Sequence, residues 1–202
     1  MAGMNKRHYD SEQTRRQIAD KAALLFAQKG FAGTSIADIS KTSGFSKGHI
    51  YYHFENKELL FIYLAEETMR LWGEKWEAVS AAYPTATKKL YAMADFVMNQ
   101  YRTPLLAAGQ ELAANPATSP ETVRRIQGLA VTPMQAYAAI LKMGVDDGEF
   151  DIPSERLQET SFLFGTWMGA LCPFIFTMEP EALRRLFQQS VTIFLGGIRR
   201  AD

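Results

Sequence analysis

The sequence predicts an all-α protein of about nine helices, with a three-helix N-terminal head that contains a helix-turn-helix and a larger C-terminal helical body. Apolar residues recur at helical spacing in nearly every segment, no segment alternates apolar and polar residues over any length, and Gly or Pro separates the segments. With 202 residues, 47% of them hydrophobic and 22% charged, the chain suffices for one large or two small domains. We expect the domain boundary between residues 57 and 58.

The head is expected to begin with a disordered polar segment, residues 1–10, followed by a long helix. Ser11 is the predicted N-cap of this helix, which carries apolar residues on one face as far as about Gln28. Gly30 should end it, because glycine tolerates the left-handed conformation of a helix C-terminus. We expect this helix to pack across the two that follow.

Residues 34–57 predict two short helices joined by a tight turn. Thr34 or Ser35 can cap the first helix, Gly44 supplies a left-handed residue at its end, and Ser46 can cap the second. Two helices joined by a short glycine-containing turn form the helix-turn-helix pattern, whose second helix enters the major groove of DNA.

The second helix of this pair is expected to bury Ile50 and Phe54, which lie four residues apart, and to expose polar and aromatic residues. A cation such as Lys47 near a helix N-terminus opposes the helix dipole, and a bound phosphate would reverse that effect. Tyr51 and Tyr52 can donate to phosphates or stack on sugars and bases. Alternatively, both tyrosines are half-buried packing residues and Lys47 is a solvated surface charge.

The body is expected to contain six helices. Asn56 should cap a long helix with Lys57 in its first turn, and Pro133 should kink the fourth helix of the body or divide it in two. Gly148 is the expected left-handed residue of a loop at 146–153. The predicted helices span about 56–83, 85–101, 104–114, 120–145, 154–171 and 180–200.

Charge is distributed unevenly, although the net charge of the whole chain is zero. Residues 1–57 carry nine Lys and Arg against five Asp and Glu, a net charge of +4, and the remainder carries −4. A basic head on an acidic body is expected when only one end meets phosphate. No run approaches the roughly 18 apolar residues of a membrane span, and the N-terminus lacks the apolar region of a secretory signal.

The single cysteine, Cys172, is expected to be a small core residue, and its solitary occurrence suits a reducing cytoplasm. We expect a cytoplasmic protein with no metal and no cofactor. The sequence lacks the residue patterns of common enzyme sites. There is no phosphate-binding glycine loop, no nucleophile elbow, and no His with a Cys or carboxylate at metal-ligand spacing.

The segment from Thr34 to Leu60 resembles the DNA-binding segment of the TetR family of bacterial repressors, about a quarter of the chain. Its Ser-Lys-Gly-x-x-Tyr-Tyr-His-Phe run is especially similar to the QacR-like multidrug-sensing members. Phe45 departs from that pattern, since a small polar residue is found there in a close relative. The phosphate contact at this position is expected to be lost, or to be replaced by van der Waals contact with a thymine methyl. His49 would read a base. The remaining DNA-contact residues implied by the resemblance are Thr34, Ser35, Ser46, Lys47, Gly48, Tyr51, Tyr52, His53 and Lys57.

The resemblance also implies a ligand-responsive repressor that binds double-stranded DNA as a homodimer and is released by a small-molecule effector. Large aromatic and Met side chains in the body suit a bulky, flat, apolar effector, although each of them could simply be core. Asp95 and Glu111 could pair with a cationic effector, or with Arg, or be exposed. The candidate ligand-binding residues are Trp72, Trp76, Phe96, Tyr101, Glu111, Tyr137, Trp167 and Met168.

The last two helices, about 155–200, are the expected homodimer face. The segment from Phe162 to Leu171 is too apolar all round for a one-sided surface helix, and Gly165 and Gly169 would let a partner helix approach. Alternatively, burial of this segment inside the body of the same chain explains the pattern equally. The alternative function is a helical interaction module whose head binds another protein, and salt-dependent DNA affinity would separate the two functions.

Overall fold

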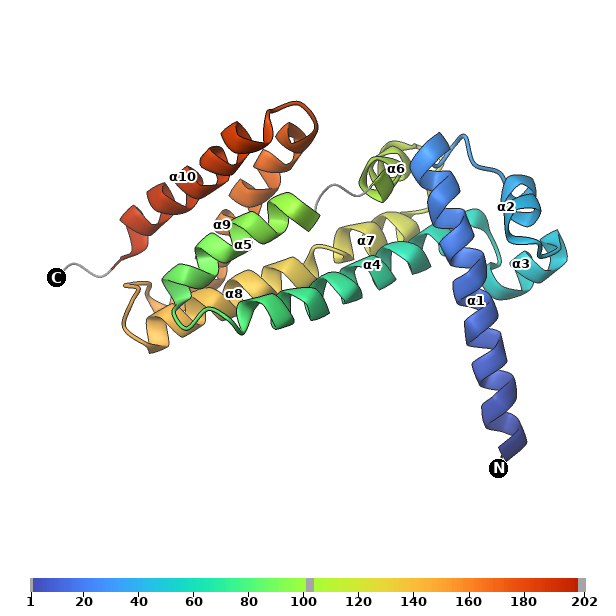
Figure 1. Cartoon of the computed structure of the whole chain (residues 1–202), viewed down its shortest axis with the longest axis horizontal. Coiled ribbons are helices and arrows are strands. Elements are labelled where there is room, and N and C mark those ends of the chain that lie inside the picture. Colours follow the sequence, from blue (N-terminus) through green and yellow to red (C-terminus); the bar gives the residue numbers. More distant parts are fainter. Residues whose placement is uncertain (1, 101–103, 200–202) are drawn as a thin grey trace. The chain divides into compact units, whose positions relative to one another are not determined.

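The computed structural model describes residues 2–100 and 104–199, and within these ranges the chain forms helices and no strand (Figure 1). Two short 3₁₀ helices, η1 (Ser154–Arg156) and η2 (Cys172–Phe176), precede and follow α9. The all-α prediction is confirmed; η2 was not expected. The α-helices are α1 (Ala2–Lys29), α2 (Ile36–Ser43), α3 (Lys47–Phe54), α4 (Lys57–Ser80), α5 (Ala86–Gln100), α6 (Pro104–Ala114), α7 (Pro120–Gly128), α8 (Val131–Asp146), α9 (Leu157–Leu171) and α10 (Pro180–Ile198).

The chain packs as two compact units that are discontinuous in sequence. The first comprises Met1–Thr68 and Thr103–Leu129, so that α6 and α7 join the three helices of the head. The second comprises Met69–Arg102 and Ala130–Asp202. The domain boundary predicted between residues 57 and 58 separates a DNA-binding part from an effector-binding part. The two packing units do not test that functional division, so it stays a prediction.

The helix α1 begins at Ala2, and the expectation that the N-terminal segment is disordered is therefore wrong for residues 2–10. This segment has no proline, and nothing in it prevents the helix from continuing upstream of Ser11. At the other end, Gly30 is left-handed with φ of 73°, as predicted for a residue that ends a helix.

Three phenylalanine rings from three elements form the centre of the first unit. Phe26 of α1 stacks on Phe31 at 5.6 Å, and Phe61 of α4 meets both rings edge-on, at 5.3 Å and 5.7 Å between ring centroids. Burying such a side chain stabilises a fold by roughly 1.5–3 kcal/mol, with a further contribution from the ring geometry. The buried core around them includes Ile18, Ala22, Leu25, Ile39, Ile50, Phe54, Leu60, Leu64, Ala108 and Leu112.

Polar contacts attach α7 to the N-terminal half of α4. Thr122 donates its hydroxyl hydrogen to Glu58 Oε2 at 2.7 Å, and the Arg125 guanidinium binds both carboxylate oxygens of Glu66 at 2.7–3.0 Å. A two-pronged Arg–carboxylate pair fixes orientation better than a single-point contact does. These contacts, with α6 packed on α1, explain why residues 104–129 belong with the head.

The predicted helix at 120–145 is two helices. Ser119 caps α7 and Pro120 occupies its first position, where a missing N–H is tolerated. The helix ends at Gly128, and α8 begins at Val131, which places Pro133 in the first turn of α8. The expected break is thus confirmed, and it lies upstream of the proline because a first-turn residue has no intrahelical N–H bond to lose.

The second unit has its own core, in which aromatic rings again make edge contacts. Phe96 of α5 lies 5.2 Å from Trp72 and 5.4 Å from Trp76 between ring centroids, and Phe164 of α9 lies 5.3 Å from Tyr137 of α8. Cys172 is buried as predicted, and its thiol donates to the carbonyl of Met168 at 3.4 Å.

Glutamate 149 caps the N-terminus of α5 from the loop that follows α8. Its carboxylate oxygens accept from the backbone N–H groups of Ala86 at 2.7 Å and Thr87 at 3.0 Å. Desolvation raises the pKa of the Glu149 carboxyl, but the hydrogen bonds from Thr87 and Ala86 outweigh that effect, so the pKa lies below its ordinary value of 4.5. Gly148 in the same loop is left-handed with φ of 74°, as predicted.

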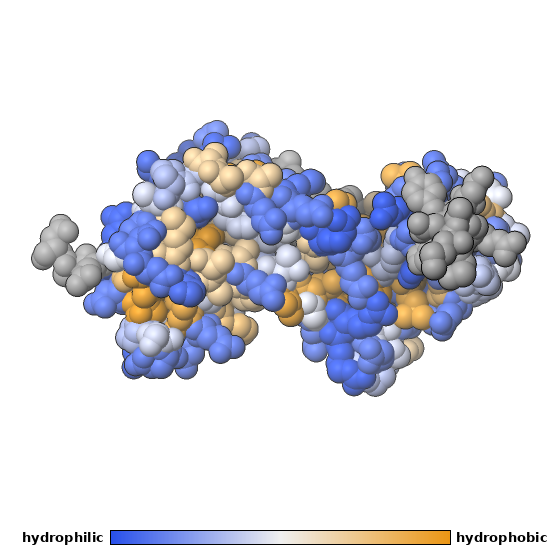
Figure 2. All heavy atoms as spheres, turned by 90° about the horizontal axis from the view of Figure 1, so that it is seen from below, coloured by the Kyte–Doolittle hydropathy of each residue, from blue (hydrophilic) through white to orange (hydrophobic). Residues whose placement is uncertain are grey.

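The molecular face in Figure 2 is largely hydrophilic, with hydrophobic residues between the polar ones. Across residues 2–100 and 104–199, none of the helices combines the length and apolar character needed to cross a bilayer.

Replacing Glu149 with Gln should lower the free energy of unfolding by about 1–2 kcal/mol at pH 7, because an amide accepts at only one oxygen and its NH₂ faces an N–H donor. A depressed carboxyl pKa stabilises the fold above pH 4.5, and that stabilisation is lost as pH falls through the folded-state pKa. Urea unfolding at pH 7 and pH 3 checks this, and an equal difference between the two proteins at both pH values would contradict it.

Candidate nucleic-acid interface and effector-binding region

The helix-turn-helix is shaped by short-range caps. Ser35 and Asp38 form a reciprocal capping box at the start of α2: Asp38 N–H donates to Ser35 Oγ, and Ser35 N–H donates to Asp38 Oδ2, both at 3.1 Å. Hydrogen bonds from Ser35 lower the pKa of the Asp38 carboxyl. Gly44 ends α2 with φ of 78°, and Ser46 caps α3 by accepting from His49 N–H at 3.2 Å. All three predicted caps and the turn are confirmed.

The helix α3 presents one buried and one exposed face. Ile50 and Phe54 are buried in the core of the first unit, as predicted. On the exposed face, Tyr52 retains 80% of its accessible surface and Tyr51 retains 48%. A tyrosine left 80% exposed on a well-packed helix contributes little to folding and is available to a partner. The other predicted contact residues that are exposed are Ser35, Ser46, Lys47, Gly48 and His49.

Aromatic rings follow one another along this face. Phe45 meets His49 edge-on at 5.4 Å, the His49 and His53 rings stack at 5.3 Å, and Tyr52 meets His53 edge-on at 5.2 Å. Burial lowers the pKa of the His53 imidazole, and the nearby charges of His49 and Arg15 lower it further. The pKa of His53 therefore lies below its ordinary value of 6.5, and this imidazole is protonated less readily than a free one.

Two of the predicted DNA-contact residues have their polar groups engaged inside the first unit. Thr34 is fully buried, and its hydroxyl donates to the carbonyl of Gly30 at 2.8 Å. The Lys57 ammonium donates to the carbonyls of Phe31 and Thr34, both at 2.8 Å, and burial lowers its pKa despite the opposing effect of Glu111. In this structure the Thr34 hydroxyl is therefore withheld from a phosphate, and Lys57 serves the turn between α1 and α2.

Glu111, predicted as an effector ligand, belongs to the first unit. Its carboxylate accepts from the backbone N–H groups of Phe31 at 2.7 Å and Ala32 at 3.0 Å. Sequence reasoning missed this arrangement because the partners lie about 80 residues apart. Arg15 was also missed: its guanidinium lies 4.4 Å from the centre of the Tyr63 ring and 5.2 Å from that of Phe54, a cation–π contact between α1 and its neighbours.

The remaining predicted effector residues with described side chains lie in the second unit. Trp72, Trp76 and Phe96 form one aromatic group, and Tyr137 and Met168 belong to the same buried core. Trp167 lies at the surface of α9 and is 36% exposed. Tyr101 lies outside the described residues.

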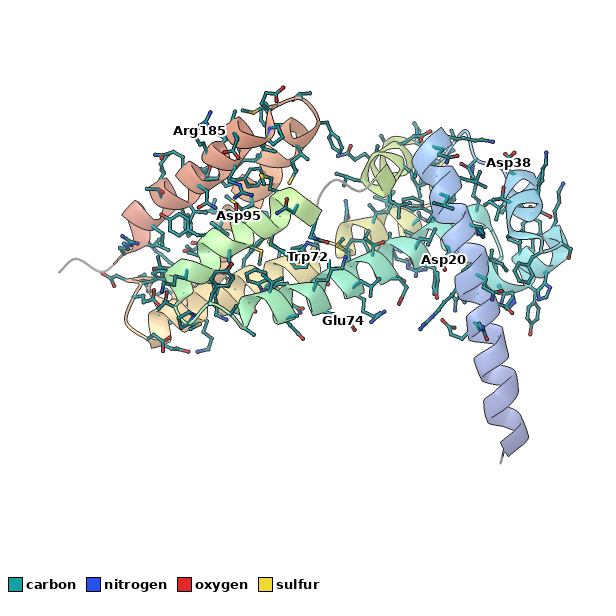
Figure 3. All side chains as sticks on the ribbon, in the orientation of Figure 1. Asp20, Asp38, Trp72, Glu74, Asp95 and Arg185 are labelled. Carbon is teal, nitrogen blue, oxygen red and sulfur yellow. The ribbon has the colours of Figure 1, made fainter. Side chains whose placement is uncertain are left out.

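A carboxylate lies close to this core. Asp95, labelled in Figure 3, is on α5, and its Oδ1 is buried without a hydrogen-bond partner. Arg184 of α10 forms an ion pair with it at the outer limit of distance, since its Nε lies 4.0 Å from Asp95 Oδ1. The Asp95 side chain as a whole is 39% exposed, and a closer cation or donor would stabilise its buried oxygen.

Comparison with known families agrees with this geometry. The family described as "Bacterial regulatory proteins, tetR family" matches residues 18–64, and "QacR-like protein, C-terminal region" matches residues 68–200. The chain belongs to the TetR family. The first match covers the helix-turn-helix, and TetR proteins are DNA-binding transcriptional regulators.

Individual TetR relatives align over nearly the whole chain. The regulator QacR of Staphylococcus aureus is 25% identical over 185 residues, which cover 91% of this chain and 97% of QacR. A putative TetR-family regulator from Mesorhizobium loti superposes with a TM-score of 0.80 at 22% identity, over 94% of this chain and 98% of that one. FadR of Bacillus subtilis, solved with stearoyl-CoA, superposes with a TM-score of 0.74 at 21% identity, over 91% and 99%.

Two glycines of the helix-turn-helix should respond to alanine in opposite directions. Neither Gly44 nor Gly48 has atoms close enough to obstruct a Cβ, but only Gly44 has a positive φ. Gly44→Ala should therefore destabilise the protein by about 1 kcal/mol, and Gly48→Ala should be neutral or stabilise it by up to about 1 kcal/mol because Gly48 lies within α3. Thermal unfolding of the two variants beside wild type measures the difference, and a loss of stability in both would contradict it.

Proposed function

We propose that the protein is a TetR-family repressor that binds a near-palindromic operator as a homodimer, placing α3 of each protomer in a major groove. The observation that supports this most strongly is the exposed face of α3, on which Lys47, His49, Tyr51 and Tyr52 project together around the caps of a well-ordered helix-turn-helix. The two tyrosine hydroxyls and Lys47 would bind phosphates, and His49 would donate to a base acceptor.

Phe45 and Gly48 complete the proposed interface. Phe45 is half-buried against His49, so its exposed edge would contact a thymine methyl instead of a phosphate. Gly48 has no side chain, and a Cβ there would meet only Ser46 Oγ, at 4.0 Å, so a DNA backbone could approach the first turn of α3.

The homodimer is proposed to form through α9 and α10. Phe162 and Leu163 of α9 are 63% and 65% exposed, and Ile193 of α10 is 56% exposed. Gly169, Gly196 and Gly197 have open space at their Cβ positions, which suits close helix approach, whereas Gly165 faces Met134 and Tyr137 inside its own unit. Large exposed apolar side chains among small residues are characteristic of an interface between subunits.

The effector is proposed to bind in the second unit, among Trp72, Trp76, Phe96, Tyr137 and Met168. Flat aromatic faces and an adaptable Met suit a bulky aromatic molecule. Asp95 favours a cationic effector, because its Oδ1 accepts no hydrogen bond and Arg184 reaches it only at 4.0 Å.

Release would follow from a shift in population. An effector that binds one conformation of the second unit better than another moves the protein towards that conformation by the difference in affinity. The helix α4 runs from Lys57 to Ser80 and thus belongs to both units. A tilt of α4 would change the separation of the two recognition helices, which must match successive major grooves.

DNA binding can be tested by fluorescence anisotropy with duplexes tiled across the region upstream of the protein's own gene, at two salt concentrations. One near-palindromic tile should bind tightly, and raising the salt should weaken it. Lys47→Ala and Tyr52→Ala should each weaken binding by roughly tenfold or more, since each removes a proposed phosphate contact without loss of core packing. Lys142→Ala, which removes an exposed lysine paired with Asp146 on α8, is the matched control and should leave affinity unchanged.

Equal weak binding to every tile, indifferent to these substitutions, would contradict regulation of this locus and favour a protein-binding head. A tile that does bind can then be used to test the effector, by measuring release of the protein from this duplex. The cation tetraphenylphosphonium should release wild type more strongly than neutral triphenylphosphine oxide does. Asp95→Asn should abolish that difference, and release by both compounds alike from wild type would contradict a role for the Asp95 charge.

The homodimer can be tested by sedimentation of Leu163→Asp and Ile193→Asp. A two-fold interface contains each substitution twice, so the dimer dissociation constant should rise at least about 100-fold. Val131→Asp is the control, because Val131 is 53% exposed on α8 in the same unit but outside the proposed face. A dimer that survives both substitutions would exclude the α9–α10 face.

A further inference from the structure

The turn between α1 and α2 is held by side chains of opposite charge from two other helices. This turn runs from Gly30 to Thr34 and leads directly to the capping residue of α2, Ser35. Its backbone N–H groups at Phe31 and Ala32 point to α6, and its carbonyls at Phe31 and Thr34 point to α4. Two hydrogen bonds also lie within the turn, from Thr34 N–H to the Phe31 carbonyl at 3.3 Å and from the Thr34 hydroxyl to the Gly30 carbonyl at 2.8 Å.

Each oxygen of the Glu111 carboxylate accepts a hydrogen bond from one of two consecutive backbone N–H groups. Consecutive N–H groups beside a left-handed residue form a concavity that binds anions, and Gly30 supplies that residue here, with φ of 73°. The approach is close: a Cβ at position 30 would lie 2.7 Å from Glu111 Oε2. The turn therefore requires both the conformation and the small size of glycine while Glu111 occupies it.

Lys57 of α4 binds the same turn. Its ammonium donates to the carbonyls of Phe31 and Thr34 and lies 4.2 Å from the centre of the Phe31 ring. Ala108 and Leu112 of α6 are buried in the apolar core of the first unit. Apolar packing is non-directional, whereas the two hydrogen bonds of Glu111 also require a fixed distance and angle to the Phe31 and Ala32 amides. Glu111 is thus the contact that fixes the turn with respect to α6.

We infer that Glu111 is a positioning residue for DNA binding, and this inference rests on the proposed function. Glu111 holds the α1–α2 turn so that α2 and α3 are presented to the major groove. It lies on α6 and acts on the helix-turn-helix through the backbone of Phe31 and Ala32, without contacting DNA. A small change in the direction of α2 carries α3 with it, because the two helices pack together across the Gly44 turn. Recognition of bases requires the side chains of α3 at hydrogen-bond distance, so even a small rotation removes contacts.

Glu111→Gln is the direct test, since it keeps size and shape but offers one acceptor in place of two and turns an NH₂ towards an N–H donor. Glu149→Gln is the matched control, because Glu149 binds two consecutive N–H groups in the same way in the second unit. Both variants are checked by circular dichroism and sedimentation, so that unfolding or loss of the dimer is not mistaken for loss of positioning. Glu111 is exposed, which makes an unfolded variant unexpected.

Two readouts separate positioning from general stability. Exchange of the Phe31 and Ala32 amide hydrogens, followed by NMR, should be at least about tenfold faster in Glu111→Gln and unchanged in Glu149→Gln. Affinity for the duplex tile that wild type binds most tightly should fall about tenfold in Glu111→Gln only. The slope of log affinity against log salt should stay at the wild-type value, whereas Lys47→Ala should reduce it by about one.

Unchanged exchange in Glu111→Gln would overturn the inference, and so would faster exchange with wild-type affinity or an equal loss of affinity in Glu149→Gln. If wild type binds no tile, regulation of its own locus is contradicted and the affinity readout is lost. Amide exchange then tests alone whether Glu111 orders the turn, and unchanged exchange would again overturn it.

Discussion

The structure depends on satisfying backbone N–H groups where the chain changes direction. Helix ends and turns leave N–H groups without intrahelical partners, and burying them unpaired costs about as much as a lost hydrogen bond. Short side chains do this locally at Ser35, Ser46 and Ser119. At two places a glutamate that is distant in sequence accepts these hydrogen bonds, Glu111 in the first unit and Glu149 in the second. The local caps shape single helices, and the distant ones connect helices that are far apart in sequence.

That distinction explains how much of the fold could be predicted. The caps of α2 and α3 and the Gly44 turn are decided within four residues of sequence, and all were predicted correctly. The break between α7 and α8 follows from the same rules, although its position required knowing that a first-turn proline is tolerated. The helical state of residues 2–10 was missed because the expectation rested on a polar composition and a possible cap at Ser11, and neither prevents a helix.

The candidate site was less accessible to sequence reasoning, because side-chain direction depends on non-local packing. Lys57 and Thr34 fit a DNA-contact pattern by type and spacing, and in the structure both make hydrogen bonds in the α1–α2 turn, so their contact with DNA stays a prediction. Glu111 is a lone carboxylate in an apolar helix, and the sequence alone could not distinguish an effector ligand from a partner of backbone amides 80 residues away. The exposed residues of α3 were easier to place, since Ile50 and Phe54 determine which side of that short helix is buried.

The exposed face of α3 is rich in aromatic rings and poor in formal charge. Lys47 is the only Lys or Arg in α3, and burial lowers the pKa of the His53 imidazole, which disfavours its charged form. Attraction to DNA of any sequence grows with the number of phosphates that are neutralised, so such a helix adds little to it. In the proposed complex, the electrostatic attraction to phosphates then comes mainly from the rest of the head, since residues 1–57 together carry a net charge of +4 and α3 supplies only one lysine. The helix α3 can contribute chiefly through its exposed aromatic and hydrogen-bonding side chains, and contacts of that kind to base edges depend on the DNA sequence.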